Sequence, residues 1–132
     1  MTYRASCHCG GVKISFPVLR EESALRCDCS LCRRKGAIMI TVMEDELTIE
    51  REITLGCYQF GTMTARHYFC TRCGIYTHHR RRSNPKEFGV NLGCVEGADV
   101  RREVPWVDGV NHPSDAVGQD ADSAVEESAP CD

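Results

Sequence analysis

The chain has 132 residues, about the length of a single domain, and its 42% hydrophobic residues suffice for a core although only 7% of residues are aromatic. No stretch approaches the roughly 20 apolar residues needed to span a bilayer, and Met1–Cys7 lacks the apolar region of a secretory signal. The formal net charge of −3 arises at the C-terminal end: without residues 116–132 the balance is 16 basic against 14 acidic residues (19 minus 5), which is no argument for nucleic acid.

Short apolar runs separated by turn residues predict a mostly β domain over residues 1–115. In chain order, we expect strands at residues 12–16, 37–42, 47–50, 58–60, 66–69, 78–79, 88–92 and 104–107. Helical signals are weak: Ser30 is the expected cap of a short turn over 31–35 that Gly36 ends, and 19–25 is a poorer candidate. From about Ala116 the chain becomes acidic and small, which predicts a disordered tail over 116–132.

Cysteine is the most informative residue type in this chain. Seven of the ten cysteines fall into three tight clusters, at residues 7–9, 27–32 and 70–73. Without an export signal, such a pattern indicates a reducing, cytoplasmic location and metal or redox chemistry rather than disulfides, which remain the alternative. Four thiolates close a tetrahedral zinc site, and the other three make a site with one open position. The count therefore predicts one structural metal and one that acts, with metal supplying part of the folding stability.

The closed site is predicted from two pairs of cysteines that are each followed by glycine. Cys70-x-x-Cys73 has the spacing of a zinc knuckle, and Cys7-x-Cys9 supplies the second pair 61 positions earlier. A shared zinc would cross-link the N-terminal strand to the middle of the domain. A redox-active pair or unliganded core thiols are the alternatives, but no thioredoxin-like βαβ pattern is present.

The open site is predicted from Cys27-x-Cys29-x-x-Cys32, where the chain must turn around an ion. Water or a substrate thiolate as fourth ligand would make this site reactive, whereas Cys57, Cys94 or a histidine would close it. Basic residues flank the cluster and would offset its charge or attract an anion, although a solvated surface face is the simpler reading for each one alone: Arg26, Arg33, Arg34 and Lys35.

The cysteine clusters resemble those of the glutathione-dependent formaldehyde-activating enzyme family, also called the centromere-protein-V domain family. The similarity covers about residues 3–115 and includes Phe69-Cys70-x-x-Cys73-Gly74, residues 74–85 and 89–91, and Asp108–Pro113. It implies an Mss4-like fold of several small, coiled antiparallel sheets stapled by zinc. It also implies a structural zinc on Cys7, Cys9, Cys70 and Cys73 and a catalytic zinc on Cys27, Cys29 and Cys32. Asp28 stands where many relatives have histidine.

The resemblance implies a carbon–sulfur lyase that condenses glutathione with formaldehyde. Our hypothesis is that a thiol, glutathione or similar, binds the second zinc as thiolate and adds to a small aldehyde. Arginine binds carboxylates bidentately, so four arginines are the candidates for holding glutathione: Arg33, Arg34, Arg80 and Arg81. The expected partners are a small-molecule thiol and aldehyde, with no membrane, and a homodimer is allowed.

Two other functions remain open. One is a non-catalytic zinc module for protein or nucleic-acid interaction, which the short basic run at residues 79–82 favours and the scarcity of aromatic residues disfavours. The other is an enzyme that uses a different low-molecular-weight thiol. Among the histidines, His78 and His79 should point to opposite faces of a strand, one toward the site and the other to the surface. His8 is expected in solvent, His67 in a structural role, His112 in a loop, and Trp106 in the core.

Overall fold

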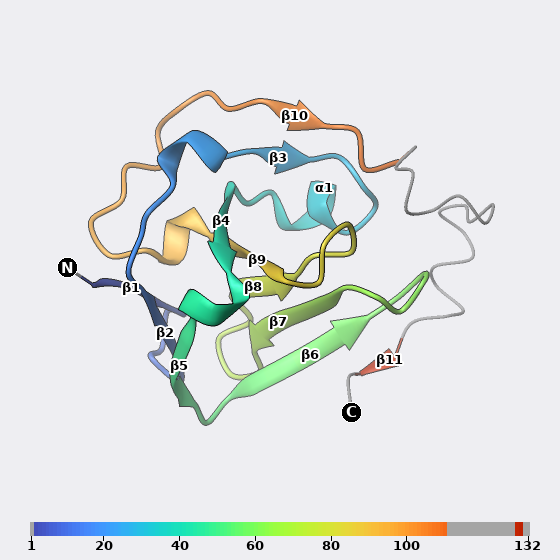
Figure 1. Ribbon diagram of the computed structural model, residues 1–132. Coiled ribbons are helices and arrows are strands. Elements are labelled where there is room, and N and C mark those ends of the chain that lie inside the picture. Colours follow the sequence, from blue (N-terminus) through green and yellow to red (C-terminus); the bar gives the residue numbers. More distant parts are fainter. Residues whose placement is uncertain (1, 111–128, 131–132) are drawn as a thin grey trace.

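The computed structural model describes residues 2–110 and 129–130, which form three β-sheets (Figure 1). The largest is a six-stranded antiparallel sheet. Its order across the sheet is β11 (Ala129–Pro130), β6 (Leu55–Gln59), β7 (Arg66–Cys70), β8 (Tyr76–Arg80), β9 (Glu87–Asn91) and β4 (Met39–Met43). The other residues of the predicted tail, and His112, lie outside the described residues.

Two smaller sheets complete the mostly β fold. An antiparallel sheet of β1 (Tyr3–Ser6), β2 (Val12–Phe16) and β5 (Thr48–Glu52) lies beside the large sheet. The short strands β3 (Arg26–Cys27) and β10 (Trp106–Val107) pair at the opposite end of the molecule, beyond helix α1 (Figure 1). This last pair is parallel, so the expectation of antiparallel sheets fails at this position.

The main hydrophobic core lies between the three-stranded sheet and strands β4 and β9. Along β2, Val12, Ile14 and Phe16 are buried and Lys13 is exposed, as the alternation predicts, but Ser15 is buried as well and its hydroxyl donates to Glu50 at 2.6 Å. The three apolar residues belong to the buried apolar set of the domain, which includes Ala5, Ile38, Ile40, Val42, Val90 and Leu92. Each fully buried Val, Leu, Ile or Phe side chain contributes about 1.5–3 kcal/mol relative to an exposed one. This core holds together the two sheets from which the cysteines at 7, 9, 70 and 73 come.

Helical structure is confined to short segments. Helix α1 runs over Cys32–Lys35 and ends at Gly36, whose φ of 65° is the left-handed conformation that glycine adopts easily. Its N-cap is Leu31 with no side-chain cap, so the predicted capping role of Ser30 is wrong. The three-residue segments η1 (Glu21–Ser23), η2 (Glu44–Glu46) and η3 (Leu92–Cys94) are turns of 3-10 helix.

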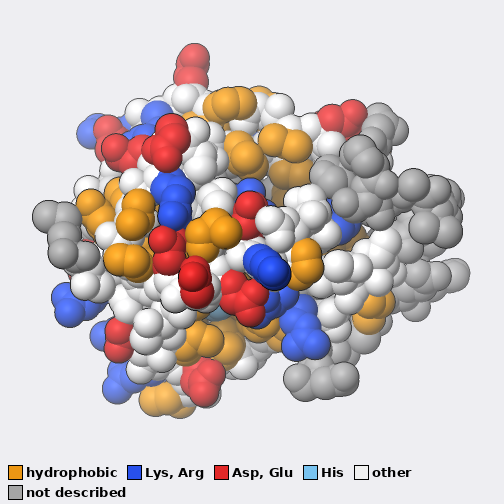
Figure 2. Space-filling model, in the orientation of Figure 1, with side chains coloured by type: hydrophobic (Ala, Val, Ile, Leu, Met, Phe, Trp, Pro, Cys, Tyr) orange, Lys and Arg blue, Asp and Glu red, His pale blue; other side chains and the backbone are white. Residues whose placement is uncertain are grey.

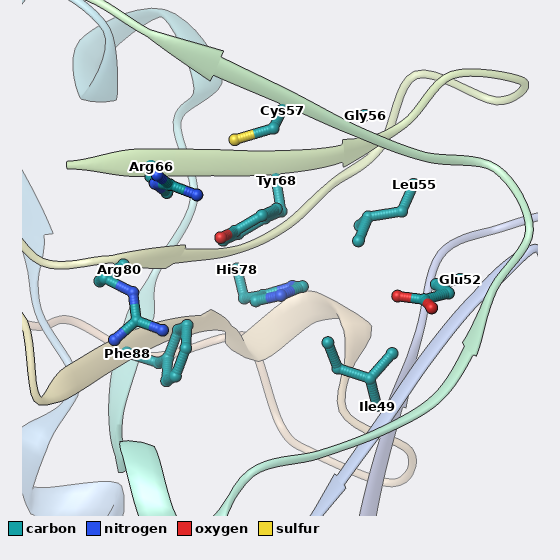
Figure 3. A pocket seen from close by; sticks show the side chains of 10 residues that line it. All are labelled: Ile49, Glu52, Leu55, Gly56, Cys57, Arg66, Tyr68, His78, Arg80 and Phe88. Atoms are coloured by element: carbon teal, nitrogen blue, oxygen red, sulfur yellow. The ribbon is translucent and has the colours of Figure 1, made fainter. Parts of the chain in front are cut away.

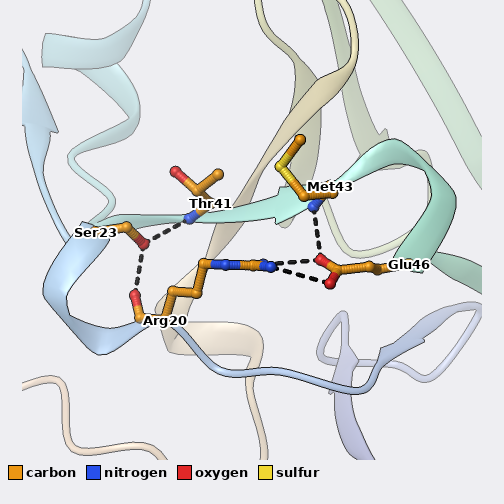
Figure 4. A network of polar contacts seen from close by, with 5 residues as sticks. All are labelled: Arg20, Ser23, Thr41, Met43 and Glu46. Atoms are coloured by element: carbon orange, nitrogen blue, oxygen red, sulfur yellow. Dashed lines mark hydrogen bonds and ion pairs between the residues drawn. The ribbon is translucent and has the colours of Figure 1, made fainter.

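A polar network fixes the segment that leads into β3 (Figure 4). Arg20 donates two hydrogen bonds to the Glu46 carboxylate, at 2.8 and 2.9 Å, and the backbone N–H of Met43 donates to the same carboxylate at 3.1 Å. The Ser23 hydroxyl donates to the Arg20 carbonyl and accepts from the Thr41 N–H at 2.8 Å. Bidentate pairs of this kind fix orientation as well as distance, so η1 is held against β4 just before the second cysteine cluster begins.

The surface carries mixed charges. On the face shown in Figure 2, acidic and basic side chains lie interspersed with apolar ones. Trp106 is 63% exposed, with the Arg26 guanidinium 5.9 Å from its ring centre, so the expected core position of this residue is wrong. The reason is local: β10 pairs with β3 in a two-stranded sheet, and among the described residues no second layer covers this side of the sheet. No helix among the described residues is long and apolar enough to cross a membrane.

Candidate metal centres

The first cluster joins two distant parts of the chain. Cys7 and Cys9 follow β1, while Cys70 ends β7 and Cys73 lies in the turn before β8. All four Sγ atoms lie within 4.8 Å of one another. Zinc–sulfur bonds of about 2.3 Å in a tetrahedron require Sγ–Sγ distances of about 3.8 Å. The Sγ–Sγ separations of 3.8 Å for Cys7–Cys9 and 3.5 Å for Cys9–Cys70 therefore fit a zinc ion.

The sulfur atoms of this cluster accept hydrogen bonds from the surrounding backbone. The N–H of Val12 donates to Cys7 Sγ, and those of Arg72 and Cys73 donate to Cys70 Sγ, each at 3.3 Å. Thr54 Oγ1 lies 3.0 Å from Cys70 Sγ. Although burial opposes ionisation, these contacts lower the pKa of Cys70 to about 5. Such partners stabilise a thiolate and hold a metal ligand in place.

The second cluster is local in sequence. Cys27 ends β3, Cys32 begins α1, and Cys29 lies in the turn between them. Their Sγ atoms also lie within 4.8 Å of one another, and the three side chains are half-buried. The backbone N–H groups of Cys29 and Cys32 donate to Cys27 Sγ and Cys29 Sγ, at 3.5 and 3.3 Å. Among the described residues, no fourth Cys, His, Asp or Glu donor joins this group.

A glycine closes one side of the second cluster. A Cβ atom added to Gly109 would collide with Cys27 Sγ and lie 2.7 Å from Cys29 Cβ. Asp28 Oδ1 accepts the Gly109 N–H at 2.8 Å, and the Asp28 N–H donates to the Val107 carbonyl at 3.2 Å. Asp28 therefore holds the segment after β10 over the cysteines rather than serving as a ligand.

The three thiols of the second cluster influence one another strongly. Hydrogen bonds from Cys27 and Cys32 lower the pKa of Cys29. The contacts of Cys32 with Cys27 and Cys29 raise the pKa of Cys32. The contact with Cys29 is also the main cause that raises the pKa of Cys27. One thiolate therefore forms easily and two more do not unless positive charge is added. This behaviour suits a cluster that binds a metal cation.

Lys35 provides fixed positive charge beside the second cluster. Its Nζ lies 3.8 Å from the centre of the Tyr76 ring, is shielded from solvent and has no hydrogen-bond acceptor among the described residues. Burial lowers its pKa, and the neighbouring Cys32, Cys29 and Cys27 sulfurs raise it. In the sequence, Lys35 is one of four basic residues that flank the cluster, and composition alone does not distinguish it from the others. Its spacing could have indicated that it faces the cluster, because residues at i and i+3 share a face of a helix and Lys35 follows Cys32 by three positions.

A wall of neutral aromatic and imidazole groups lies behind Lys35. His67 Nδ1 is 2.6 Å from the Tyr76 hydroxyl, and the His67 ring centre is 5.4 Å from that of His79. Burial lowers the pKa of His67 to about 3 and that of His79 well below its usual value, while it raises the pKa of Tyr76. Both imidazoles are therefore uncharged and the tyrosine is protonated at neutral pH.

A β-bulge brings Tyr76 onto this wall. Tyr76 pairs with Phe69 and His78 with Tyr68, so Thr77 is an extra residue in β8. The extra residue reverses the alternation, which places Tyr76 on the same face as His79 although they are three residues apart. Sequence reasoning missed Tyr76 for this reason.

The predicted carboxylate-binding arginines occupy three different environments. Arg33 and Arg34 are exposed on α1, and Arg34 donates to the Ser30 carbonyl at 2.6 Å. Arg81 is half-buried, lies 3.6 Å from Glu87, and its Nε and one terminal nitrogen are shielded without an acceptor. Arg80 lies 3.3 Å from Glu44 and stacks on Phe88, on the face of the sheet that carries His78.

The remaining candidates separate into core and surface. His78 and His79 do point to opposite faces, since His78 stacks on Tyr68, but His78 is 1% exposed and the expectation of a surface position is wrong. His8 is exposed, as expected. Cys94 is free and buried, whereas Cys57 is disulfide-bonded, so neither closes the second cluster among the described residues.

Comparison with known proteins agrees with this arrangement. A sequence profile described as glutathione-dependent formaldehyde-activating enzyme matches residues 2–106, which contain both clusters. The chain belongs to this family. A crystal structure of a Rhodobacter sphaeroides protein superposes with a TM-score of 0.75 at 52% identity, covering 79% of this chain and 99% of that one. The mostly β, formaldehyde-activating-enzyme-type fold with two cysteine clusters is thus as the sequence predicted.

Proposed function

We propose that this member of the formaldehyde-activating family is a zinc-dependent, carbon–sulfur lyase-type enzyme that adds glutathione or a similar thiol to formaldehyde or another small aldehyde. The second cluster carries the proposal, because its three sulfurs converge and no fourth donor joins them among the described residues. Three-ligand sites leave a position for substrate, whereas four-cysteine sites are structural. The first cluster would accordingly hold a structural zinc ion.

Sulfur donors in this number favour zinc among the common divalent metals. When bound, zinc lowers the pKa of a coordinated thiol, so that a thiolate nucleophile exists at neutral pH. The chain's own contribution is to bring three sulfurs together in one turn, to shield them with Gly109, and to place the Lys35 ammonium beside them. In the overall reaction a C–S bond forms, the C=O double bond becomes a single bond, and the thiol proton ends on the oxygen.

Lys35 would stabilise the charge that develops during the reaction, and the neutral wall would hold Lys35 in position. Negative charge moves from sulfur to the aldehyde oxygen during addition, and a shielded ammonium stabilises such charge better than solvent does. The hydrogen bond between Tyr76 and His67 fixes the ring against which Lys35 lies. Tyr76 therefore acts as a positioning residue.

The carboxylates of glutathione need cationic partners. Arg81 supports this role most directly, because two of its nitrogens have no acceptor among the described residues. Arg33 and Arg34 offer exposed guanidinium groups on the outer side of α1. Arg80 is supported least, since its guanidinium contacts Glu44 and Phe88 on the other face. The alternative of a nucleic-acid module gains nothing from the basic run, because Arg80 and Arg81 both pair with glutamates.

The proposal is tested by zinc content and zinc-edge spectroscopy with a matched pair of variants. The wild type should contain two zinc ions, and glutathione should add one sulfur to the second ion's shell. Cys27→Ser should contain one zinc ion and form S-hydroxymethylglutathione no faster than the reaction without enzyme. Cys94→Ser, which removes a buried thiol outside both clusters, should keep both ions and the rate. Unchanged zinc content in Cys27→Ser would remove the basis of the proposal.

A further inference from the structure

A pocket lies on one face of the six-stranded sheet (Figure 3), the face opposite to that of the neutral wall. Its volume is about 400 Å³, within the range of small-molecule sites. Tyr68, His78 and Arg80 line it. His67 and His79, which are part of the wall, alternate with these residues along β7 and β8 and therefore lie on the other face. Apart from Arg80, the least supported candidate for holding glutathione, the proposed thiol–aldehyde reaction uses none of the residues that line this pocket.

The floor of the pocket is flat and largely apolar. The Tyr68 and His78 rings stack with their centres 4.6 Å apart and their planes 17° apart. Leu55 and Ile49 add aliphatic surface, and Ile49 is 44% exposed although it is a large apolar residue. Burial lowers the pKa of His78 to about 4, so this floor is uncharged at neutral pH. It fits an apolar or aromatic body of a ligand.

One end of the pocket is basic. Arg66 and Arg80 are direct cross-strand partners on β7 and β8, an arrangement in which like charges repel. Arg80 is already compensated by Glu44 at 3.3 Å and donates to the Pro85 carbonyl at 2.6 Å. No ion pair or side-chain hydrogen bond joins Arg66 to any other described residue. Its guanidinium is thus one uncompensated positive charge at the pocket.

The other end is acidic. Glu52 lies in Figure 3 on the far side of the Tyr68–His78 stack from Arg66 and Arg80. Leu55, another residue of the pocket lining, pairs with Cys70 on β7. Cys70 is four positions from Arg66, which is about 13 Å of strand, so the pocket is long enough to keep its two ends apart. A ligand with a second negative charge at that end would be repelled, whereas a single anionic group at the Arg66 end would not.

We infer that this pocket binds a small organic monocarboxylate with an apolar or aromatic body. The carboxylate would accept hydrogen bonds from Arg66, whose planar fork matches it bidentately, and the body would lie on the Tyr68–His78 floor. A dianionic phosphate monoester should bind less well, because Arg80 is already paired with Glu44 and the one remaining arginine charge does not balance both phosphate charges.

The test is an amide chemical-shift titration of the zinc-loaded full chain with benzoate, benzamide and phenyl phosphate. Benzoate should give saturable shifts at Tyr68, His78 and Phe88 and bind more tightly than the other two. Arg66→Gln should weaken benzoate binding by about tenfold or more, the loss expected for a charge-assisted hydrogen bond. Arg51→Gln, on exposed strand β5 and outside the pocket lining, should bind as the wild type does.

Arg66→Lys is the conservative control: it keeps the positive charge but removes the planar guanidinium that binds a carboxylate bidentately. It should bind benzoate with an affinity between those of the wild type and Arg66→Gln. Unchanged shifts away from the pocket establish that each variant is folded. Absence of saturable benzoate shifts, equal affinity for benzamide, tighter binding of phenyl phosphate, or an unaffected Arg66→Gln would each overturn the inference. None of these outcomes bears on the thiol–aldehyde reaction, which rests on the cysteine cluster of the other region.

Discussion

The two cysteine clusters use the same ligand atom but are held by the chain in different ways. The first draws on segments 61 positions apart, buries Cys7 and Cys70, and surrounds their sulfurs with backbone N–H donors. The second comes from one six-residue turn whose three cysteines are only half-buried, with Lys35 beside it. A metal that cross-links distant segments would contribute to folding, whereas a metal held by a local turn would leave the fold independent of it. We therefore propose that the first cluster is the structural centre and the second the reactive one.

The largest effect should come from breaking the first cluster. Cys70→Ser should abolish cooperative folding, because zinc binding in such sites supplies about 10–16 kcal/mol, as much as the stability of a whole domain. Cys29→Ser, at the second cluster, should remain folded with one zinc ion. Circular dichroism melts and metal analysis of both variants measure this contrast. A folded Cys70→Ser, or an unfolded Cys29→Ser, would reverse the assignment of the two centres.

The clusters themselves were predictable because the ligands within each segment are close in sequence. Spacing alone identified all seven cysteines, and Gly36 as the end of α1. The surroundings were not predictable in the same way. Tyr76 reaches its place through the extra residue Thr77, which breaks the alternation on which strand predictions rest. Gly109 approaches Cys27 from a segment 82 positions later (109 minus 27), and no local pattern encodes that contact.

The next largest effect should come from filling the space that Gly109 leaves. Gly109→Val should displace the segment after β10 or distort the cysteine turn, because even a Cβ atom would collide with Cys27 Sγ. We expect loss of most zinc from the second cluster, with the first cluster and the melting temperature little changed. Metal analysis and competition with a chelator measure the loss. Val110→Ala, at an exposed neighbouring position, is the control, and full zinc retention in Gly109→Val would contradict the packing described above.

A smaller effect should follow from removing the charge beside the second cluster. Lys35→Met keeps the length of the side chain but removes the ammonium, so zinc affinity at this cluster should fall by about tenfold, in line with the effects of groups that surround metal ligands. Affinity at the first cluster should not change. Lys86→Met, at an exposed loop position, serves as the control. Equal zinc affinity in both variants would mean that Lys35 contributes only its packing on Tyr76.

The smallest effect should come from the wall behind Lys35. Tyr76→Phe removes the hydroxyl that lies 2.6 Å from His67 Nδ1 but keeps the ring that faces the ammonium. Loss of one hydrogen bond costs about 1 kcal/mol, which corresponds to a several-fold fall in turnover if the wall positions Lys35. The fall should appear in kcat rather than in KM or zinc content, because the ring and the cysteines are untouched. Tyr3→Phe, in a ring stack with Phe16 on the other sheet, should leave kcat unchanged. A Tyr76→Phe variant that loses zinc instead would show that the wall supports the metal centre itself and that the two regions differ less than their ligand counts suggest.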